Sequence, residues 1–338
     1  MIVEALKILS NGKDLDFSLM KSVMAEITEG KVSDIQLAAF LTALKVKGET
    51  IDEITAAAQI MKEKCLKTDL ESTNTLDIVG TGGDMSNTFN ISTTCAFVVA
   101  AGGVPVAKHG NRALTSKSGS VDVLEALGIN VNKTAEQEKQ IFNSLNLCFM
   151  FAKNHHPAMK YAANVRKELK FRTLFNILGP LTNPACAKSQ LFGVFDEKLV
   201  HNLAVVISRL GVNNVLVVHG KDGLDEASVS DETVITECIN GKMKDYTVKP
   251  EDFGINRADK SELTGGNADD NALIIKNIFN GKETGAKKDI VVLNSGLAFY
   301  TFGKTKSIQE GINLAENIIK SGLAADKLEK YIKISNEV

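Results

Sequence analysis

The sequence predicts a small all-helical domain followed by a larger α/β domain with a mostly parallel central sheet. From Asp16 to about Leu66 the apolar residues recur at helical spacing. From about Thr75 onward, short apolar runs typical of strands alternate with polar loops and helical stretches. This order favours a parallel sheet with helices on both faces. The length of 338 residues is enough for about two domains.

Three helix start signals divide the N-terminal region. Asp16, Ser33 and Thr50 can each cap a helix. Ser33 and Thr50 also stand three residues before a glutamine and a glutamate, which is the spacing of a capping box. We therefore expect the helical domain to span residues 1–70.

The first unit of the larger domain is a strand, a glycine-rich loop and a helix. Residues 76–79 are expected to form the strand, and the loop Gly80-Thr-Gly-Gly-Asp84 follows it directly. Ser92 or Thr93 can cap the helix, which should end at the glycine pair 102–103.

The same order then repeats along the chain. We expect a strand at 104–107, a polar loop, and a helix at 121–127 that Gly128 stops. Thr134 is expected to open a further helix, and residues 148–152 a strand. The clearest buried strand is 214–218.

The segment 154–185 holds three of the chain's five prolines and has helical periodicity. We interpret it as a return to the helical domain with a hinge at each end. The helical domain is thus residues 1–70 with a return segment at about 165–186, and the α/β domain is residues 75–160 and 187–338. Within the latter, residues 237–270 are expected to be a strand-and-turn surface insertion, and two amphipathic helices at about 289–302 and 307–320 to close the chain.

Composition excludes several function classes. The net charge of −2 gives no global field for nucleic acid or for an anionic membrane, so we expect neither partner. The five cysteines lie 30 or more residues apart without a CxxC pair, as expected of free thiols in a reducing compartment. The N-terminus lacks a basic signal region, and the longest apolar run has 13 residues. We expect a cytoplasmic protein.

Two loops have the composition of anion sites. In the loop Gly80–Asp84, glycines allow positive φ and let backbone N–H groups approach a phosphate. Asn90-Ile-Ser-Thr93 adds hydroxyls at a helix start, where anions are favoured. Alone, either would be an ordinary turn or a cap. After the next strand, however, residues 108–120 supply cations and four hydroxyls, and both loops should lie at the carboxyl edge of the sheet.

A third loop at this edge is acidic. Asp225 and Glu226 follow the strongest strand, and hard oxygen ligands near phosphates indicate Mg²⁺, with Asp84 assisting through water. Arg166 can present a planar fork to a substrate carboxylate, although in isolation it would be a surface ion-pair partner. We assign the pair His155-His156 to a hinge or a pocket wall, and His201 to a helix surface.

Six motifs resemble the anthranilate phosphoribosyltransferase family in order and spacing. They are GTGGD, NTFNIST, KHGNR with SKSGS.DVLEALG, HHPAMK with VRKEL, RT.FN.LGPLTNP and VHG.DGLDE, and they cover about residues 76–226. The resemblance implies a nucleoside phosphorylase-like fold, a homodimer formed through the helical domain, and Mg²⁺ as cofactor. It also implies transfer of phosphoribose from 5-phosphoribosyl 1-diphosphate (PRPP) to the amino nitrogen of anthranilate, in tryptophan biosynthesis.

The resemblance assigns site residues by motif, with no essential catalytic base. The metal ligands would be Ser92, Asp225 and Glu226. Anthranilate would contact Gly80, His109, Asn111 and Arg166. The residues around PRPP would be Gly80, Gly83, Asp84, Thr88, Asn90, Ile91, Ser92, Thr93, Lys108, His109, Gly110, Asn111, Arg112, Ala113, Leu114, Thr115, Ser116 and Ser120.

Two residues depart from the family pattern. Thr115 stands where serine is common, and Met85 stands where a small residue is usual. Neither removes an implied ligand. Since we recognise no glutamine amidotransferase segment, we expect any anthranilate synthase partner to be a separate chain.

Two alternatives stay open. A pyrimidine nucleoside phosphorylase would share the fold and both anion loops but would use inorganic phosphate without a metal. A non-catalytic, nucleic-acid-binding relative would show a basic face and lack pocket residues. The Asp225-Glu226 turn and the pair Asn111 and Arg166 favour the PRPP enzyme.

Overall fold

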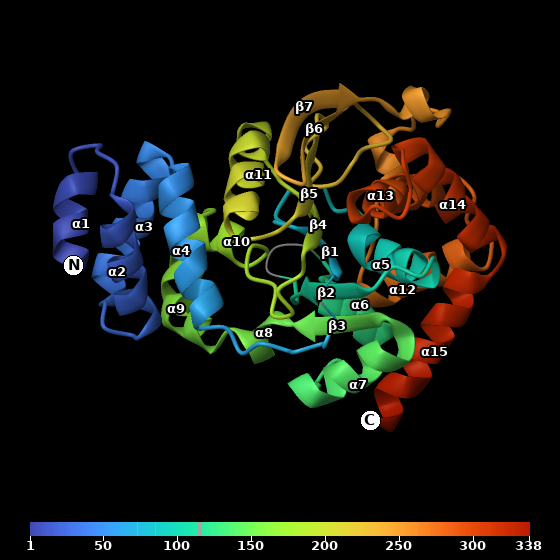
Figure 1. Cartoon of the computed structure of the whole chain (residues 1–338), viewed down its shortest axis with the longest axis horizontal. Coiled ribbons are helices and arrows are strands. Elements are labelled where there is room, and N and C mark those ends of the chain that lie inside the picture. The colour runs from blue at the N-terminus through green and yellow to red at the C-terminus, as the bar shows by residue number, and fades with distance from the viewer. Residues whose placement is uncertain (73, 85, 114–116) are drawn as a thin grey trace.

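The computed structural model describes residues 1–72, 74–84, 86–113 and 117–338. A bundle of helices at the N-terminal end lies beside a sheet that helices cover on both faces (Figure 1). The small helical unit and the mostly parallel α/β unit expected from the sequence are both present.

The helical unit begins where the sequence indicates. The Asp16 side chain accepts a hydrogen bond from Leu19 N at 2.8 Å, and Ser33 and Thr50 both close capping boxes. The first helix was not expected from the sequence. The helices of the unit are α1 (Ile2–Leu9), α2 (Phe17–Thr28), α3 (Asp34–Lys47) and α4 (Ile51–Glu63).

The return segment packs against this bundle. Helix α9 (Lys160–Leu169) contacts α3, and α10 (Leu174–Leu178) contacts α4. The bundle core, with Met24, Phe40 and Ile54 fully buried, continues through α11 (Val200–Arg209) to Phe192 on the sheet. One continuous apolar core thus joins the helical unit to one face of the sheet.

In the described chain, the strands form one seven-stranded sheet in the order β3-β2-β1-β4-β5-β6-β7. The first five positions are parallel, and β6 and β7 add an antiparallel hairpin at the edge. This hairpin overlaps the start of the strand-and-turn insertion expected at 237–270, but it begins four residues earlier, at Thr233. The bounds are β1 (Leu76–Gly80), β2 (Val106–Gly110), β3 (Leu147–Phe151), β4 (Ser189–Gly193), β5 (Asn214–Gly220), β6 (Thr233–Ile239) and β7 (Lys242–Val248).

Strands β1 and β2 diverge toward their carboxyl ends. One residue pair, Leu76 with Val106, is in register between these two fully described strands, whereas β1 and β4 share five. Buried side chains bridge the gap: His109 N donates to Asp77 Oδ1 at 3.2 Å, and Lys108 Nζ donates to the carbonyl of Ile78. The divergence opens space at the edge where the predicted loops begin.

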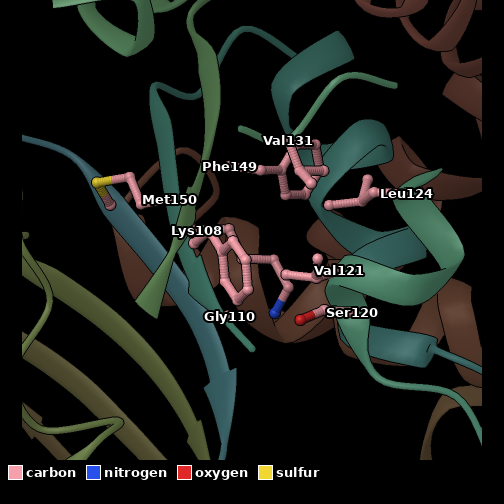
Figure 2. Close-up of a pocket in the computed structure, with 9 residues that line it drawn as sticks. Lys108, Gly110, Ser120, Val121, Leu124, Val131, Phe149 and Met150 are labelled. Carbon is pink, nitrogen blue, oxygen red and sulfur yellow. The ribbon is translucent and has the colours of Figure 1, made fainter. Parts of the chain in front are cut away.

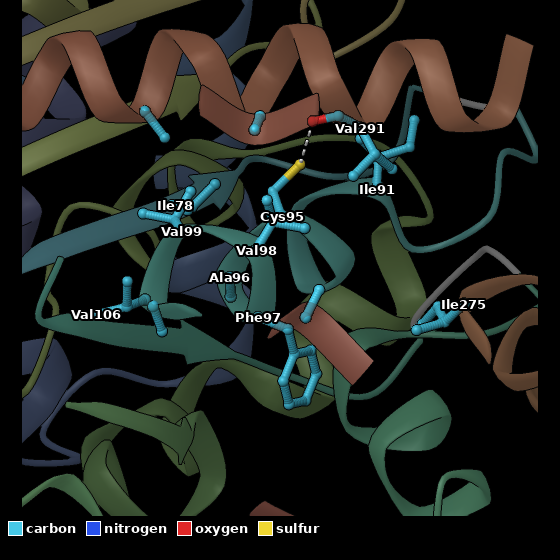
Figure 3. Close-up of a cluster of buried hydrophobic side chains, with 14 of the residues drawn as sticks. Ile78, Ile91, Cys95, Ala96, Phe97, Val98, Val99, Val106, Ile275 and Val291 are labelled. Atoms are coloured by element: carbon cyan, nitrogen blue, oxygen red, sulfur yellow. Dashed lines mark hydrogen bonds between the residues drawn. The ribbon is translucent and has the colours of Figure 1, made fainter. Parts of the chain in front are cut away.

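The opposite face of the sheet is covered by α5 (Ile91–Ala101), which packs on β1 and β2, and by α13 (Ala286–Phe302), which packs beside it on β4 and β5. Figure 3 shows Cys95 pointing from α5 to α13, where its Sγ lies 3.5 Å from the carbonyl of Val291. Phe97 on α5 packs edge-on against Phe279 and Tyr331 at ring distances of 6.1 and 6.0 Å. Buried on nearly all sides, α5 is the central helix of this layer.

Several sequence expectations need correction. Strand β2 runs to Gly110, so Lys108 and His109 belong to the strand and not to the loop. Asn90 occupies the cap position of α5, while Ser92 and Thr93 lie inside its first turn. Besides α1, the sequence did not predict α12 (Ala268–Phe279), which begins in the supposed insertion, or α15 (Leu323–Glu337) after α14 (Ile308–Lys320). Strand β4 was not predicted either. Helix α13 is largely buried and is not amphipathic.

The remaining helices are short connectors or cover the sheet edge. Thr134 caps α7 with a full capping box, as expected.

Within the described ranges, none of the helices is both long and apolar enough to cross a membrane. The remaining bounds are α6 (Ser120–Ala126), α7 (Ala135–Leu145), α8 (Ala152–His155), η1 (Pro157–Met159), η2 (Glu197–Leu199), η3 (Pro250–Phe253) and η4 (Lys260–Leu263).

A buried polar cluster fixes the chain between the helical unit and the sheet. His155 lies with Nδ1 2.8 Å from the Leu66 carbonyl and Nε2 2.9 Å from Glu138 Oε1. Thr68 Oγ1 donates to the other oxygen of Glu138 at 2.7 Å. Both ring nitrogens face acceptors, so the imidazolium form suits the site. Burial opposes that charge, but the hydrogen bond and charge of Glu138 outweigh it and raise the pKa of His155.

We predict that the contribution of this cluster to stability falls as the pH rises. A raised folded-state pKa means that the stabilisation is complete below the unfolded pKa of about 6.5 and is lost as the pH passes the folded value. Glu138→Gln should therefore cost about 2 kcal/mol of unfolding free energy near pH 6 and clearly less near pH 9, as measured by urea denaturation. Glu71→Gln, at an exposed ion pair with Lys139, is the control. An equal cost at both pH values would contradict the prediction.

Candidate active site

The strand order places a topological switch point between β1 and β4. The chain leaves β1 for β2 and β3 on one side and returns to β4 on the other. In open α/β sheets, ligands bind in the crevice outside the carboxyl ends of the strands at such a point. The loops after β1, β2 and β5 are the three that the sequence singles out.

Two glycines leave room for the acidic turn at this point. Gly80 and Gly193 are paired in register at the ends of β1 and β4. A Cβ at Gly80 would lie 2.5 Å from Asp225 Oδ2, and a Cβ at Gly193 would overlap the Asp225 carbonyl. Asp225 therefore sits across both strand ends, and Gly82 N donates to its Oδ2 at 2.6 Å. The first and third predicted loops meet in direct contact.

The acidic turn carries more negative charge than the protein neutralises. Removal from water, followed by the charge of Asp84, raises the pKa of Asp225 to about 7. Removal from water and the charge of Asp225 raise the pKa of Glu226 to about 8, against the opposing effects of Lys108 and of a hydrogen bond from Ser92. Such a site stabilises a bound cation.

The donor set fits a hard divalent cation in part. Ser92, Asp225 and Glu226 present oxygens only, which is the chemistry that Mg²⁺ prefers. Among the described residues, no three His, Cys, Asp or Glu side chains are grouped closely enough to hold a metal by themselves. A bound Mg²⁺ would thus need oxygens from a ligand or water to complete its shell.

Lys108 lies within the sheet beside this turn. Its buried ammonium donates to the Ile78 carbonyl and, at 3.2 Å, to Ser92 Oγ. Burial lowers the pKa of Lys108, while Asp77 and Glu226 oppose that shift. The lysine therefore links β1, α5 and the acidic turn.

His109 follows Lys108 on β2, and its buried side chain points to the other face of the sheet. Its ring packs against His156 at a centroid distance of 5.0 Å, and its Nε2 is buried without a hydrogen-bond partner in the described chain. Burial and then the neighbouring His156 hold the pKa of His109 well below its usual range, so the ring is neutral at pH 7. His156 thus forms a wall behind His109, while His155 holds the interdomain link.

The second loop is organised around Asp122. Ala113 N and Gly119 N both donate to Asp122 Oδ2, at 2.9 and 2.8 Å. Ser120 Oγ donates to the Asn111 carbonyl at 3.1 Å. These bonds close the ends of the loop. Leu114, Thr115 and Ser116, together with Met85 of the first loop, lie outside the described residues.

Arg112 is turned away from the predicted cradle. Its guanidinium forms a bidentate pair with Glu125 at 2.7 Å and reaches Asp122 at 3.0 Å. The Glu125 hydrogen bond is the main cause of the raised pKa of Arg112. The predicted role of Arg112 in contacting a phosphate is therefore weak in this arrangement, because its donors face helix α6.

A small cavity adjoins the second loop. Figure 2 shows Lys108 and Gly110 of β2 facing Ser120 and Val121 of α6, with Phe149 of β3 near Val131 and Leu124. Its volume of about 10 Å³ is enough for one water molecule and not for a substrate.

The first loop is tied to its surroundings along its length. Asp84 accepts from Ser86 N at 3.2 Å, and Thr88 pairs with Thr264 in an antiparallel bridge. Ile91 is buried at the start of α5, and Thr93 Oγ1 is buried without a partner in the described chain. Gly83, with φ +70°, has a conformation that suits glycine.

Arg166 stands apart from the loops, on α9. Its guanidinium lies 5.9 Å from the ring centroid of Phe175, and burial lowers its pKa. Within the described ranges it forms no ion pair, and no contact joins it to His109 or Asn111. A half-buried arginine without a carboxylate partner is suited to an anionic ligand.

No role was assigned from the sequence to Asp77, Arg172 or Asn183, which lie beside these loops. Arg172 stacks over Phe195 at 4.1 Å and lies beside Gly83, whose Cβ position is 3.4 Å from Arg172 Nε. Asn183 Nδ2 donates to Asp77 Oδ2 at 2.7 Å and to the Ala107 carbonyl at 2.8 Å. Asp77 is an isolated acid in the otherwise apolar strand 76–79, and Arg172 and Asn183 both stand in the motif RT.FN.LGPLTNP, so the sequence did carry a signal for these residues.

Comparison with known families covers nearly the whole chain. Residues 72–325 match the model described as glycosyl transferase family, a/b domain, and residues 3–65 match the helical bundle domain of the same family. Anthranilate phosphoribosyltransferase from Methanobrevibacter smithii is 52% identical over 99% of this chain and 100% of the relative. The enzyme of that name from Ruminiclostridium cellulolyticum is also 52% identical, over 99% and 98%.

Solved structures agree with the sequence relatives. Anthranilate phosphoribosyltransferase from Thermus thermophilus superposes with a TM-score of 0.93 at 41% identity, covering 98% of this chain and 99% of that one. The Saccharomyces cerevisiae enzyme in complex with PRPP and Mg gives 0.90 at 27% identity, covering 100% and 98%. The same yeast enzyme has been solved with 4-fluoroanthranilate.

Proposed function

The chain belongs to the anthranilate phosphoribosyltransferase family, and we propose that it transfers the phosphoribosyl group of PRPP to the amino nitrogen of anthranilate in tryptophan biosynthesis. Pyrophosphate is the second product. The observation that carries this proposal is the contact between Asp225 and the glycine loop at the switch point, beside Lys108 and Ser92. This arrangement suits a substrate that carries both a diphosphate and a metal.

PRPP would lie across the carboxyl ends of β1 and β2. The N–H groups in the first turn of α5 and the glycines of the first loop are donors suited to phosphate oxygens. As the bond to the diphosphate breaks, negative charge grows on the leaving group, and fixed donors stabilise it without reorganisation. The yeast enzyme has been solved in complex with PRPP and Mg, which supports PRPP as the ligand.

Ser92, Asp225 and Glu226 would hold Mg²⁺. When bound, the ion would neutralise charge on the departing diphosphate. The half-buried carboxylates with raised pKa values support this assignment, because each is stabilised as an anion by a nearby cation. Lys108 would keep Ser92 oriented through its hydrogen bond.

Anthranilate would enter beside His109. The neutral ring and unpartnered Nε2 of His109 can contact the aromatic acid without adding charge. Gly80 and Asn111 complete the proposed wall, and Arg166 would pair with the carboxylate of the substrate. An aromatic amine is neutral and nucleophilic at pH 7, so the residues act by positioning it, and we assign no catalytic base.

We also propose a homodimer formed through α3. Ile35, Ala39, Thr42 and Val46 are exposed at spacings of four, three and four residues, and so share one face of the helix. Ile35 and Val46 are 84% and 83% exposed, although both are large apolar residues. A partner surface would cover this stripe. The five free cysteines support a reducing, cytoplasmic location.

The function is tested by following anthranilate fluorescence. We expect the signal to fall only when PRPP and Mg²⁺ are both supplied. Asp225→Asn combined with Glu226→Gln should lower turnover at least about 100-fold at ordinary Mg²⁺ while leaving the circular dichroism spectrum unchanged. Wild-type protein that leaves anthranilate unchanged but cleaves uridine with phosphate would instead indicate a nucleoside phosphorylase.

Arg166→Ala should raise the KM for anthranilate at least tenfold and change the KM for PRPP less than about twofold. The reason is that a carboxylate would lose a charge-assisted hydrogen bond worth roughly 1.5–3 kcal/mol. Steady-state kinetics with each substrate varied in turn measures both constants. Lys167→Ala, on the neighbouring position of α9, is the matched control. Equal changes in both constants would count against the carboxylate role.

Ile35→Asp combined with Val46→Asp should convert the protein to a monomer in sedimentation velocity, because charges would replace the apolar centre of the interface. Lys45→Glu alters charge on the same helix without removing apolar surface and should leave the dimer intact. A monomeric wild-type protein would refute the proposal.

A further inference from the structure

Residues 263–271 run from the end of η4 into the first turn of α12 and contact residues 87–89, which lie between the glycine-rich loop and α5. Thr88 pairs with Thr264 in an antiparallel bridge. Phe89 N donates to the Leu263 carbonyl at 3.4 Å, and Gly265 N donates to the Asn87 carbonyl at 2.9 Å. The C-terminal third of the chain thus forms a short two-stranded contact with residues 87–89, just before α5 begins.

The contact is too close for a side chain at position 265. A Cβ on Gly265 would lie 2.7 Å from both the nitrogen and the Cα of Phe89, and 2.6 Å from Asn271 Oδ1. Because Phe89 is itself buried, its backbone has little freedom to withdraw. Any residue other than glycine here would force Phe89 and the side chain of Asn271 to shift.

Asn271 connects this support to the site through Asn90. Its side chain is 1% exposed, and its Nδ2 donates to Asn90 Oδ1 at 3.0 Å while its Oδ1 accepts from Gly266 N at 2.8 Å. The Gly266 bond fixes which end of the Asn271 amide faces Asn90. The Nδ2 donor of Asn271 is therefore fixed facing the Oδ1 acceptor of Asn90.

Asn90 in turn joins the two anion loops. Its Nδ2 donates to the Ser118 carbonyl at 3.2 Å, and its Oδ1 also accepts from Ser118 Oγ at 3.3 Å. Although Asn90 occupies the cap position of α5, its side chain makes no capping bond in the described chain. The amide instead holds the second loop to the start of α5, and its orientation depends on Asn271.

We propose that Asn271 is a positioning residue for PRPP binding, acting through Asn90 to set the distance between the two phosphate-binding loops. The inference rests on the proposed function. Asn271 need not touch the substrate, since it acts on a residue assigned to the PRPP site. Loss of its hydrogen bond should free the Asn90 amide to rotate and should let the loop at Ser118 move relative to α5.

Asn271→Asp gives the sharpest test, because aspartate has the same shape. One of its oxygens still accepts from Gly266 N, while the other replaces the donor and faces Asn90 Oδ1. We expect the KM for PRPP to rise about tenfold, with the KM for anthranilate and kcat within about twofold of wild type. Thermal unfolding is measured in parallel to separate positioning from loss of fold.

Asn267→Asp is the matched control. Asn267 is the exposed cap of the same helix, where aspartate also caps well, so the charge change is identical and the Asn90 bond is kept. Its kinetic constants should match those of wild type. Gly265→Ala is a second, uncharged variant that displaces Phe89, and it should raise the KM for PRPP in the same selective way.

The possible outcomes separate this inference from the proposed function. Suppose that wild type turns over PRPP and anthranilate. If Asn271→Asp and Gly265→Ala then have the same KM for PRPP as wild type, Asn271 has no positioning role. Equal losses in both KM values and in kcat would show a structural role only, and would also overturn the inference. Should Asn271→Asp fail to fold, Gly265→Ala decides by the same criterion. If wild type itself has no such activity, the function fails and the inference fails with it.

Discussion

The site depends on one steric constraint, which is the space left by Gly80 and Gly193 at the ends of two neighbouring parallel strands. Both glycines are paired in register, and Asp225 occupies the volume that their side chains would fill. A Cβ at Gly193 would displace the backbone of the acidic turn itself, so the constraint cannot be relieved by rotating a side chain. Because the acidic turn packs directly against both strand ends, the carboxylate of Asp225 accepts a hydrogen bond from the N–H of Gly82 in the loop after β1.

The same edge of the sheet concentrates charge that the fold does not balance internally. Asp77, Asp225 and Glu226 surround the buried ammonium of Lys108, and burial raises the pKa of Asp77 to about 6 against the opposing effect of Lys108. Unpaired buried charge costs free energy, and proteins retain it where a ligand supplies the counter-charge. The lysine bridges the diverging strands, and the two turn carboxylates are the ligands of the proposed Mg²⁺. Of these four charged groups, Lys108 and Asp77 join the strands, and Asp225 and Glu226 are available to a ligand.

The sequence predicted best the features that depend on neighbouring residues. Ser33, Thr50 and Thr134 form the capping boxes that their spacing indicates, because a cap is satisfied within four residues. The end of β2 was misjudged because Lys108 and His109 are polar, and the partners that bury them, Ile78 and Asp77, lie about 30 residues earlier. Arg112 was placed in the phosphate cradle because nothing local shows that Glu125 binds its guanidinium. Gly193 carries no signal at all in the sequence, since its importance comes from its pairing with Gly80 across the sheet.

The return segment places residues of the candidate site on both the helical unit and the α/β unit. Its helix α9 packs on the bundle and carries Arg166, while Arg172 lies against the glycine loop and Asn183 hydrogen-bonds to Asp77 within the sheet. Within about 20 residues the chain passes from the helical unit to the edge of the sheet. Any movement of the bundle relative to the sheet would therefore move Arg166 with respect to His109 while Asn183 stays fixed on β1. The position of Arg166, the proposed partner of the substrate carboxylate, would thus depend on how the two units pack. The glycine loop after β1 contacts both the acidic turn, through Asp225, and the return segment, through Arg172.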